Sequence, residues 1–239
     1  PGVTVDIQTK VDYTEILDST LIALEQVNAP HIVQLDETAN QFAADQVDEN
    51  GDPLFVKLAD IATDEQRSDI DDLLPSVRDF FQINGELWGM PWNSSNPVLY
   101  INEDIFTAAG LDPDDPPSTF EEVFTACETI MATQSDLAGC INWPLAAWFP
   151  ETWVAMQGGL VVNNENGHDG RATEALLDSE EMQLALNWWK DMADAGYYTY
   201  SGVTGDYVGE GGAFITQTTA MHINSTAGIS NFQNFAGIF

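Results

Sequence analysis

Basic residues are scarce in this chain of 239 residues. Six lysines and arginines stand against 39 aspartates and glutamates, which gives a formal net charge of −33. The acidic residues are scattered, with no run longer than two. A surface of this sign opposes nucleic acid and anionic membranes, and its self-repulsion must be screened by salt. We interpret the acidity as a surface suited to saline surroundings. The alternative, an acidic face that recruits cations or a cationic ligand, would need clustering that the sequence does not show.

Long hydrophobic runs are also missing. No apolar stretch approaches the roughly 18 to 20 residues that a membrane-spanning helix needs. A positively charged, apolar leader is not present at Pro1, so we expect any signal peptide to have been removed or to lie outside this chain. Gly2 to Ile7 is typical of a strand, with no element before it. We therefore expect the chain to be a fragment that is incomplete at both ends.

Cysteine is limited to Cys127 and Cys140, which are too few for a disulfide scaffold. They lack CxxC spacing and histidine partners, which argues against zinc. The first is predicted in a helix and the second at the start of the next strand. Two alternatives stay open: a disulfide, which in an exported protein could add ~3 kcal/mol of stability, or two buried thiols.

Catalytic motifs are absent. The sequence contains no GxSxG, HExxH or Walker pattern. His31, His168 and His222 share no neighbourhood with a nucleophile or a second metal ligand, and His31 and His222 lie in apolar contexts typical of structural residues. We predict no catalytic residue, no metal site and no cofactor, and hence no enzyme. A glycoside hydrolase that uses two of the many carboxylates is the competing class, because pairs of carboxylates carry little information without geometry.

The stretch from Asp48 to Asp52 resembles a calcium loop in its alternating acidic residues. Pro53 stands where an EF-hand needs glycine, and Ala59 stands where it needs glutamate. We predict a turn here.

What is present suits a globular α/β protein, since 44% of the residues are hydrophobic and seven are tryptophan. Apolar residues at helical spacing predict a helix from Tyr13 to Val27, and His31 to Leu35 reads as a short buried strand. Together with the strand at Gly2 to Ile7, these elements predict a βαβ unit with parallel strands.

The remaining elements follow from periodicity and caps. We predict an amphipathic segment at Ile70–Phe81, a helix from the capping box Ser118–Glu121 to about Met131, a strand at Ala138–Trp143, a helix at Asp178–Ala195 stopped by Gly196, and a strand at Ala220–Ile223 followed by a ligand loop. The stretch from Asn84 to Phe106 predicts a strand, a polar crossover and a second strand. It divides the chain into a first lobe, 1–96, and a second lobe, 97–239.

The stretch from Met90 to Val123 reads MPWNSSNPVLYINEDIFTAAGLDPDDPPSTFEEV. This stretch resembles family 1 extracellular solute-binding proteins, the ligand-capturing subunits of ABC importers. It is most similar to the glycerol-3-phosphate-binding branch. The resemblance implies a two-lobed, type II-like periplasmic-binding-protein fold, each lobe a sheet flanked by helices, that closes on a small polyol phosphate or a sugar. It also implies a monomer outside the cytoplasm, in the periplasm or as a cell-surface lipoprotein, that delivers its ligand to a membrane permease. Against the family pattern, a first strand and helix and a large C-terminal part are missing.

Aromatic side chains crowd the segment that starts at Asn142, where Trp143, Trp148 and Trp153 stand between a strand and a helix. Aromatic faces beside amides and hydroxyls are typical of small-ligand sites. A place in the core remains the alternative for each tryptophan. In the family, a serine and tryptophans of this stretch reach the ligand, and here Asn142 stands in place of the serine.

The resemblance adds four more candidates. Tyr13 and Glu37 match a tyrosine and a glutamate that reach the ligand, and Ser225 and Thr226 fall on tandem serines that donate hydrogen bonds to the phosphate. The family's phosphate-binding arginine would lie beyond Phe239, and none of the six lysines and arginines falls on a ligand position. The predicted ligand site is therefore Tyr13, Glu37, Asn142, Trp143, Trp148, Ser225 and Thr226.

Overall fold

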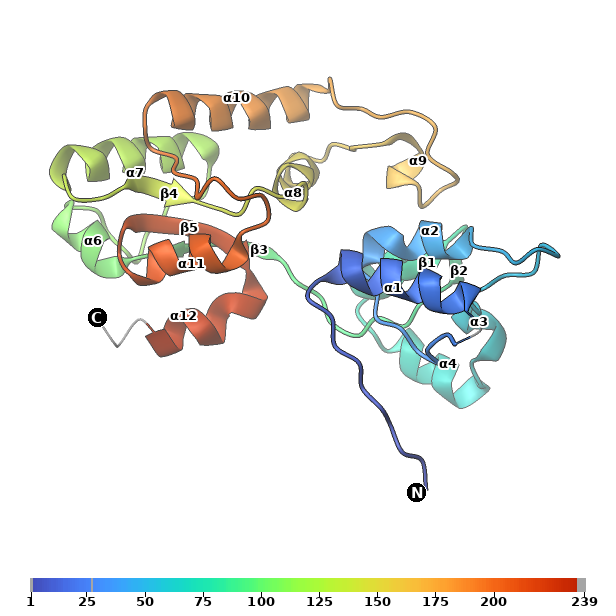
Figure 1. Cartoon of the computed structure of the whole chain (residues 1–239). Coiled ribbons are helices and arrows are strands. Elements are labelled where there is room, and N and C mark those ends of the chain that lie inside the picture. The colour runs from blue at the N-terminus through green and yellow to red at the C-terminus, as the bar shows by residue number, and fades with distance from the viewer. Residues whose placement is uncertain (1, 27, 236–239) are drawn as a thin grey trace. The chain divides into compact units, whose positions relative to one another are not determined.

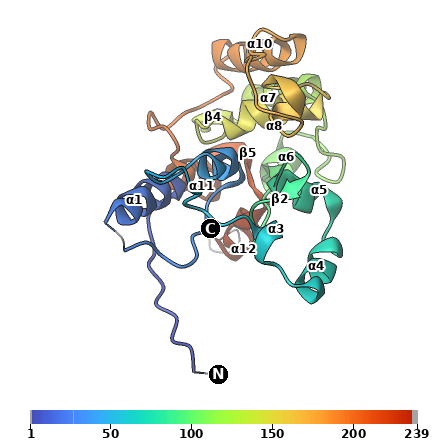
Figure 2. The same ribbon diagram turned by 90° about the vertical axis from the view of Figure 1, so that its right-hand side faces the viewer.

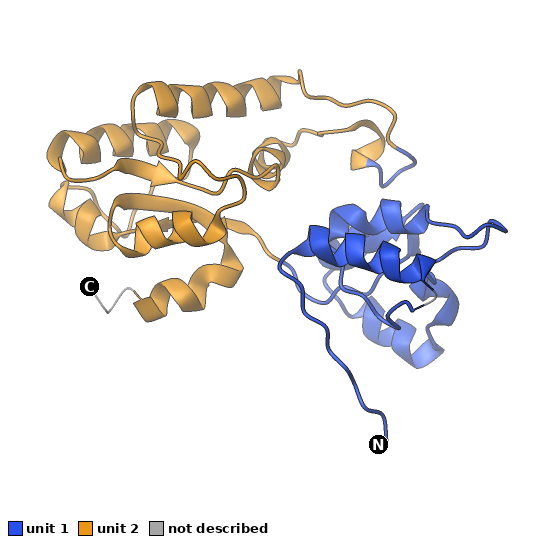
Figure 3. Ribbon diagram, in the orientation of Figure 1, with its two compact units in different colours: residues 1–94, 167–171 blue, residues 95–166, 172–239 orange. Residues whose placement is uncertain are grey.

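The computed structural model describes residues 2–26 and 28–235. The chain divides into two compact units (Figure 3). Unit 1 comprises residues 1–94 and 167–171, and unit 2 comprises 95–166 and 172–239. The short segment 167–171 thus belongs to unit 1 although both of its flanks belong to unit 2. Within the described residues, no helix combines the length and the apolar character that crossing a bilayer requires.

Unit 2 is built on a mixed three-stranded sheet with the order β3-β5-β4. The strands are β3 (Pro97–Ile101), β4 (Gly139–Asn142) and β5 (Thr219–Ser225). The central strand β5 pairs antiparallel with β3 and parallel with β4, where Ile141 lies opposite Met221. The predicted strands of the second lobe are therefore confirmed, and the sheet places the carboxyl ends of β4 and β5 at one edge.

Helices flank this sheet. Those of unit 2 are α6 (Glu103–Ala108), α7 (Phe120–Thr133), α8 (Trp148–Met156), α10 (Glu180–Asp194), α11 (Tyr207–Ile215) and α12 (Ile229–Phe235), with the 3₁₀ turn η3 (Thr226–Gly228) and the four-residue turn α9 (Asn163–Asn166). α7 lies along β4 and α11 lies along β5 (Figures 1 and 2). Gly196 ends α10 with a φ of 73°, as expected for a glycine stop.

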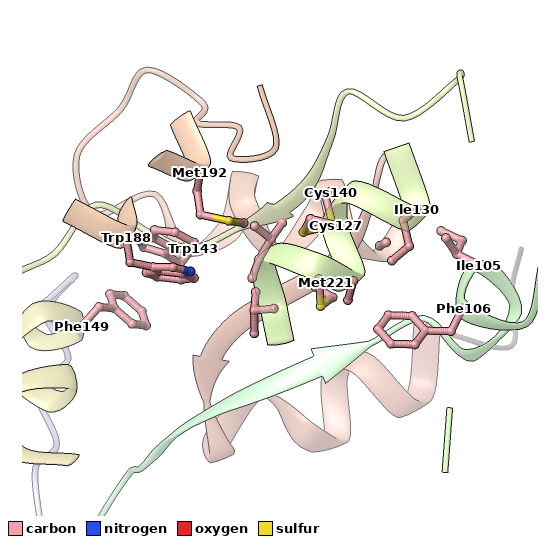
Figure 4. Close-up of a cluster of buried hydrophobic side chains, with 14 of the residues drawn as sticks. Ile105, Phe106, Cys127, Ile130, Cys140, Trp143, Phe149, Trp188, Met192 and Met221 are labelled. Atoms are coloured by element: carbon pink, nitrogen blue, oxygen red, sulfur yellow. A yellow bond between two sulfur atoms is a disulfide. The ribbon is translucent and has the colours of Figure 1, made fainter. Parts of the chain in front are cut away.

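The core of unit 2 gathers between α7, α10 and the sheet, where Trp143, Phe149, Trp188 and Met192 pack together (Figure 4). The two cysteines lie inside it. Cys127 on α7 and Cys140 on β4 form a disulfide, with a Cα to Cα distance of 5.4 Å. Of the two alternatives left open by the sequence, the structure shows the disulfide and not two buried thiols. The disulfide links α7 to the sheet.

The start of α7 differs from the prediction by one residue. Thr119, not Ser118, is the N-cap: its side chain accepts the backbone N–H of Glu122, and the carboxylate of Glu122 bonds back to the Thr119 N–H at 3.1 Å. Ser118 still contacts the same carboxylate through its hydroxyl at 2.8 Å. The capping box predicted at Ser118 and Glu121 is wrong because both roles pass to the next residue, whose backbone is extended.

Unit 1 consists of short elements: α1 (Tyr13–Glu25), η1 (Glu37–Ala39), α2 (Asn40–Ala44), α3 (Leu58–Ile61), α4 (Asp64–Asp71), α5 (Pro75–Arg78), η2 (Asp79–Phe81), β1 (Gln82–Ile83) and β2 (Glu86–Leu87). β1 and β2 form a hairpin across Asn84 and Gly85, whose φ values of 52° and 75° suit this predicted turn dipeptide.

Three predictions for this unit are wrong. Gly2 to Ile7 and His31 to Leu35 form no strand, and Val3 and Ile32 are 86% and 90% exposed. A strand exists through hydrogen bonds to a neighbour, and within the described residues nothing pairs with either segment, so the βαβ unit is not formed here. The amphipathic segment at Ile70–Phe81 is broken, because Pro75 starts the new helix α5.

Candidate functional site

The loop that leaves the central strand carries two hydroxyl groups at the sheet edge. We call residues Ser225–Gly228 the β5 loop. The Oγ of Ser225 accepts the N–H of Ala227 at 3.0 Å, and the Oγ1 of Thr226 accepts the N–H of Asn96 at 3.3 Å. A hydroxyl has one proton to donate besides its acceptor capacity. Within residues 2–26 and 28–235, neither hydroxyl donates that proton, so both half-buried side chains can still donate to a ligand.

Two further bonds hold this loop in place. The backbone N–H of Thr226 donates to the carbonyl of Asn96 at 2.9 Å, and the phenol of Tyr100 donates to the carbonyl of Ser225 at 2.7 Å. Burial raises the pKa of Tyr100, so the phenol keeps its proton and remains a donor over the whole neutral range. The loop is therefore tied to the polar crossover segment of unit 2.

Behind the loop lies a line of buried polar side chains. We call Glu210, Asn142, His222 and Asn224 the buried polar chain. The Nδ2 of Asn142 donates to the backbone carbonyl of Glu210 at 2.9 Å and to its Oε2 at 2.7 Å. The Nδ1 of His222 lies 2.8 Å from the Oδ1 of Asn142, and its Nε2 lies 2.9 Å from the Nδ2 of Asn224. The Oδ1 of Asn224 accepts the N–H of Ser225 at 2.7 Å, which connects the line to the β5 loop.

These contacts fix the tautomer of His222. Since the Asn142 amide nitrogen faces the oxygens of Glu210, its oxygen faces the imidazole, and Nδ1 must carry the proton. Nε2 then accepts from Asn224. Burial lowers the pKa of His222 to about 4, while the bond to Asn142 acts in the opposite direction. The ring is therefore neutral at pH 7 and serves as a donor on one side and an acceptor on the other.

The carboxylate of Glu210 is only 2% exposed. Its Oε1 accepts the backbone N–H of Ser201 at 2.7 Å, so both oxygens have a donor. The side chain lies in the first turn of α11, where the backbone dipoles favour a negative charge. A buried carboxylate is thus accommodated without a cation.

The structure separates the predicted tryptophans. Trp143 has no exposed surface, and its ring lies 5.4 Å from Trp188 and 4.2 Å from Tyr198, within the core. It offers no face to a ligand here. Trp148, the first residue of α8, is half-buried and contacts Phe149 at 5.3 Å between ring centroids, so part of its surface remains accessible.

Unit 1 carries the other two candidates. Tyr13 begins α1 and is 41% exposed, with its hydroxyl 3.5 Å from the Nε2 of Gln34. Glu37 begins η1 and is exposed, while its neighbour Asp36 caps the turn by accepting the N–H of Ala39. Both side chains are exposed in unit 1.

Within unit 2, Asn142 joins Ser225 through His222 and Asn224, whereas Trp143 and Trp148 stand apart from that line. Whether any of the seven predicted residues touches a ligand stays a prediction. Sequence reasoning missed the role of Glu210 and Asn224. One signal was available: His222 and Asn224 are two residues apart in β5, so both side chains lie on the same face of the strand.

Basic residues are scarce in unit 2. Lys190 is the only lysine or arginine in the sequence of unit 2, and its exposed side chain pairs with that of Asp194 on α10. The histidines, cysteines and carboxylates of the described residues form no group of three that could hold a metal ion.

Two surface hollows lie elsewhere. One of about 450 Å³ in unit 1 includes Arg67 and Arg78, and one of about 750 Å³ in unit 2 lies between α7 and α10, beside Trp188. Neither is lined by any of the seven predicted residues, so these hollows do not support the predicted site. Its support is the pair of hydroxyls at the strand end.

Comparisons with known proteins agree on one family. The family described as "Bacterial extracellular solute-binding protein" matches residues 2–238. The sn-glycerol-3-phosphate-binding periplasmic protein UgpB of Yersinia enterocolitica is 32% identical over 202 residues, covering 81% of this chain and 43% of the relative. The protein of the same name from Escherichia coli K12 is 28% identical over 236 residues, covering 95% of this chain and 50% of the relative.

Solved structures show the same fold. UgpB from Mycobacterium tuberculosis, in complex with glycerophosphocholine, matches with a TM-score of 0.72 at 21% identity, covering 93% of this chain and 54% of that one. Lmo0181 from Listeria monocytogenes, in complex with cycloalternan, matches with a TM-score of 0.72 at 20% identity and the same coverages. The chain spans about half the length of these relatives, and its fold is that of periplasmic solute-binding proteins.

Proposed function

The chain belongs to the family of bacterial extracellular solute-binding proteins, and from this premise we propose that it captures a small polyol phosphate, such as sn-glycerol-3-phosphate, for an ABC importer. The bound molecule is delivered to the membrane permease. The protein acts outside the cytoplasm, in the periplasm or at the cell surface, and works as a monomer. No bond of the ligand is made or broken.

The observation that carries this proposal is the pair of hydroxyls on Ser225 and Thr226. They follow the carboxyl end of the central strand, which is where α/β sheets bind ligands. Each hydroxyl already accepts a backbone N–H, so its proton remains available for an acceptor on a ligand. Phosphate and polyol oxygens are such acceptors. The same two positions match the phosphate-binding serines of the glycerol-3-phosphate branch.

Unit 1 supplies the complementary groups. The Glu37 carboxylate is an acceptor for ligand hydroxyls, and the Tyr13 phenol can donate or accept. Because the chain forms two units, split near the Asn96 crossover, we propose that closure on a shared ligand stabilises the bound state through contacts that exist only when both units hold it. In unit 2, Trp148 presents a partly accessible ring for the carbon face of the ligand. Asn142 acts indirectly, through His222 and Asn224 on Ser225, and Trp143 contributes to the core.

A second candidate is a neutral di- or oligosaccharide. The absence of any free lysine or arginine in unit 2, whose only cation, Lys190, is paired, favours it, because a guanidinium is the main reason a site would prefer a phosphate dianion. An aromatic ring beside hydroxyl donors serves a sugar equally well. The two candidates differ in charge, so their binding responds differently to salt.

Isothermal titration of the whole chain with sn-glycerol-3-phosphate, glycerophosphocholine and maltose tests the proposal. We expect saturable binding of a phosphate ligand and a fall in affinity of about tenfold or more when Ser225→Ala and Thr226→Val are combined, because two hydrogen bonds to a charged group are lost. Ser230→Ala, an exposed serine on α12, is the matched control and should leave affinity unchanged. Maltose binding in place of phosphate binding would select the second candidate, and no binding of any of the three would refute both.

The Glu37→Ala variant tests the share of unit 1. It should abolish ligand-induced thermal stabilisation, whereas Glu49→Ala, an exposed glutamate of the Asp48 turn, should retain it. Unchanged stabilisation in the Glu37 variant would remove this residue from the site. Incubation with glycosides addresses the competing enzyme class, since turnover would contradict a pure binding function.

A further inference from the structure

We infer that the buried polar chain of Glu210, Asn142, His222 and Asn224 is a positioning device that sets the geometry of the β5 loop. Its consequence for affinity rests on the proposed function, because that function places the Ser225 and Thr226 hydroxyls against the ligand. The geometry itself can be tested without any ligand.

The donors and acceptors of the hydrogen bonds in the buried polar chain follow one consistent order. The Asn142 side-chain amide donates both of its protons to Glu210, so the Asn142 oxygen is left to accept the Nδ1–H of His222. Nε2 of His222 then accepts from Asn224, which in turn leaves the Asn224 oxygen for the N–H of Ser225. Reversing any one amide or the imidazole tautomer would place two donors or two acceptors face to face. The order is therefore fixed from the first turn of α11 to the loop.

Burial makes this order costly to break. Asn142 and His222 have no exposed surface, Glu210 is 2% exposed and Asn224 is 7% exposed. Water cannot readily replace a lost partner at such positions, so an unpaired group keeps its full desolvation cost. Two aromatic rings also pack against the His222 ring. Phe214 stacks on it at 5.8 Å between centroids, and Phe232 lies nearly perpendicular to it at 5.4 Å. The ring cannot turn to find another partner without displacing these side chains.

The last hydrogen bond of the buried polar chain is made to Ser225, the residue that shapes the β5 loop. The N–H of Ser225 is held by Asn224 and its carbonyl by Tyr100, so side chains fix the peptide groups on both sides of this residue. The Ser225 hydroxyl then caps the 3₁₀ turn through Ala227. A rotation of the Asn224 amide would release the Ser225 N–H and turn the hydroxyl, which would misdirect the donor.

Two substitutions at one position separate the two bonds of Asn224. Asn224→Asp keeps an acceptor for the Ser225 N–H but presents its second carboxylate oxygen to Nε2, so His222 should become protonated on both nitrogens. Asn224→Leu has a similar shape and removes both bonds. Thr219→Val is the matched control, because Thr219 is buried on the same strand and its hydroxyl has no partner among the described residues.

The measurements are amide exchange of Ser225 and Ala227, the nitrogen-15 resonances of His222, and affinity for sn-glycerol-3-phosphate, all on the whole chain at pH 7. We expect Asn224→Leu to speed exchange at both amides and to weaken affinity by about tenfold, the size of one buried hydrogen-bonded group. Asn224→Asp should keep the wild-type exchange rate and show a doubly protonated imidazole, and Thr219→Val should resemble wild type in all three.

Wild-type exchange and affinity in a folded Asn224→Leu variant would overturn the inference. If that variant does not fold, Asn224→Asp decides: a His222 ring that stays neutral would show that the residue does not act on Nε2. If the wild-type protein binds no phosphate ligand, the proposed function fails. The exchange rates alone still decide whether the buried polar chain positions the β5 loop.

Discussion

Unit 2 and unit 1 bury their apolar residues to very different degrees. The described part of unit 2 closes a core of aromatic and aliphatic side chains around Trp143, Trp188 and a disulfide. In the described part of unit 1, the buried apolar residues are Ala39, Ala43 and Ile70, each of which is 8% exposed. Large side chains such as Trp92, which is 81% exposed, remain in contact with solvent there. Burial of apolar surface dominates stability, so we expect the folding energy of the chain to reside in unit 2.

The largest expected effect on stability comes from Trp143 in unit 2, and Trp92 in unit 1 provides the comparison. Trp143→Ala removes a fully buried ring and leaves a cavity, which should lower the free energy of unfolding by about 3–5 kcal/mol. Trp92→Ala, the matched control in unit 1, should change it by no more than about 0.5 kcal/mol. Urea denaturation followed by far-UV circular dichroism measures both. Equal costs for the two variants would break the comparison.

The disulfide should contribute nearly as much. Replacing both Cys127 and Cys140 by alanine releases a cross-link that spans 13 residues. The entropy gained by the unfolded chain should lower stability by about 3 kcal/mol. Amide exchange should quicken in α7 and β4 and stay unchanged in unit 1. Exchange that quickens equally in unit 1 would show that the two units do not fold independently.

A pH dependence of intermediate size follows from His222. Its pKa is lowered from 6.5 to about 4 in the folded state, so the unfolded state binds the proton more readily. This contribution to stability is fully present above pH 6.5 and is lost as the pH falls towards 4. Between pH 7 and pH 5 the loss should be about 2 kcal/mol, from 1.36 kcal/mol for each unit of pKa.

Denaturant titrations at the two pH values in constant salt test this dependence. The His222→Gln variant removes the titrating group and should flatten the difference, while His31→Gln, an exposed histidine of unit 1, should retain it. A pH dependence that persists unchanged in His222→Gln would show that other titrating groups cause the effect.

The smallest effect is expected at the segment 167–171 of unit 1. Arg171 bonds to both carboxylate oxygens of Asp45, with the Nη1 to Oδ2 distance at 2.8 Å, and this pairing lowers the pKa of Asp45. The pair is exposed, so Arg171→Ala should hardly move the unfolding midpoint. It should quicken amide exchange at residues 167–171 without affecting the β5 loop. Quicker exchange throughout unit 2 would contradict the division of the chain into these units.

The same contrast explains how far the sequence could predict the fold. In unit 2, α10 and β5 were predicted because their periodicity, caps and the stop at Gly196 are local, and because the partners of β5 lie in the same unit. In unit 1, Gly2 to Ile7 has the composition of a strand, but composition cannot supply the hydrogen-bonding neighbour that a strand requires. The apolar spacing of Ile70–Phe81 indicates one amphipathic segment, but Pro75 starts a new helix within it.

The candidate site divides in the same way. Ser225 and Thr226 are predicted from their place after a strand and from the resemblance, and within residues 2–26 and 28–235 neither hydroxyl donates a hydrogen bond. Asn142 and Trp143 are predicted from the aromatic stretch and from the resemblance, yet both are fully buried. The sequence could not show that Asn142 faces Glu210, because the two residues meet only when β4 and α11 pack together.

Hydrogen exchange of the wild-type chain, with and without saturating sn-glycerol-3-phosphate, tests whether the β5 loop holds the ligand. We predict slower exchange at Ser225 to Gly228 in the presence of the ligand, with no change along the surface of α7 and α10. Binding that leaves the β5 loop unprotected and slows exchange elsewhere in unit 2 would place the ligand at another site.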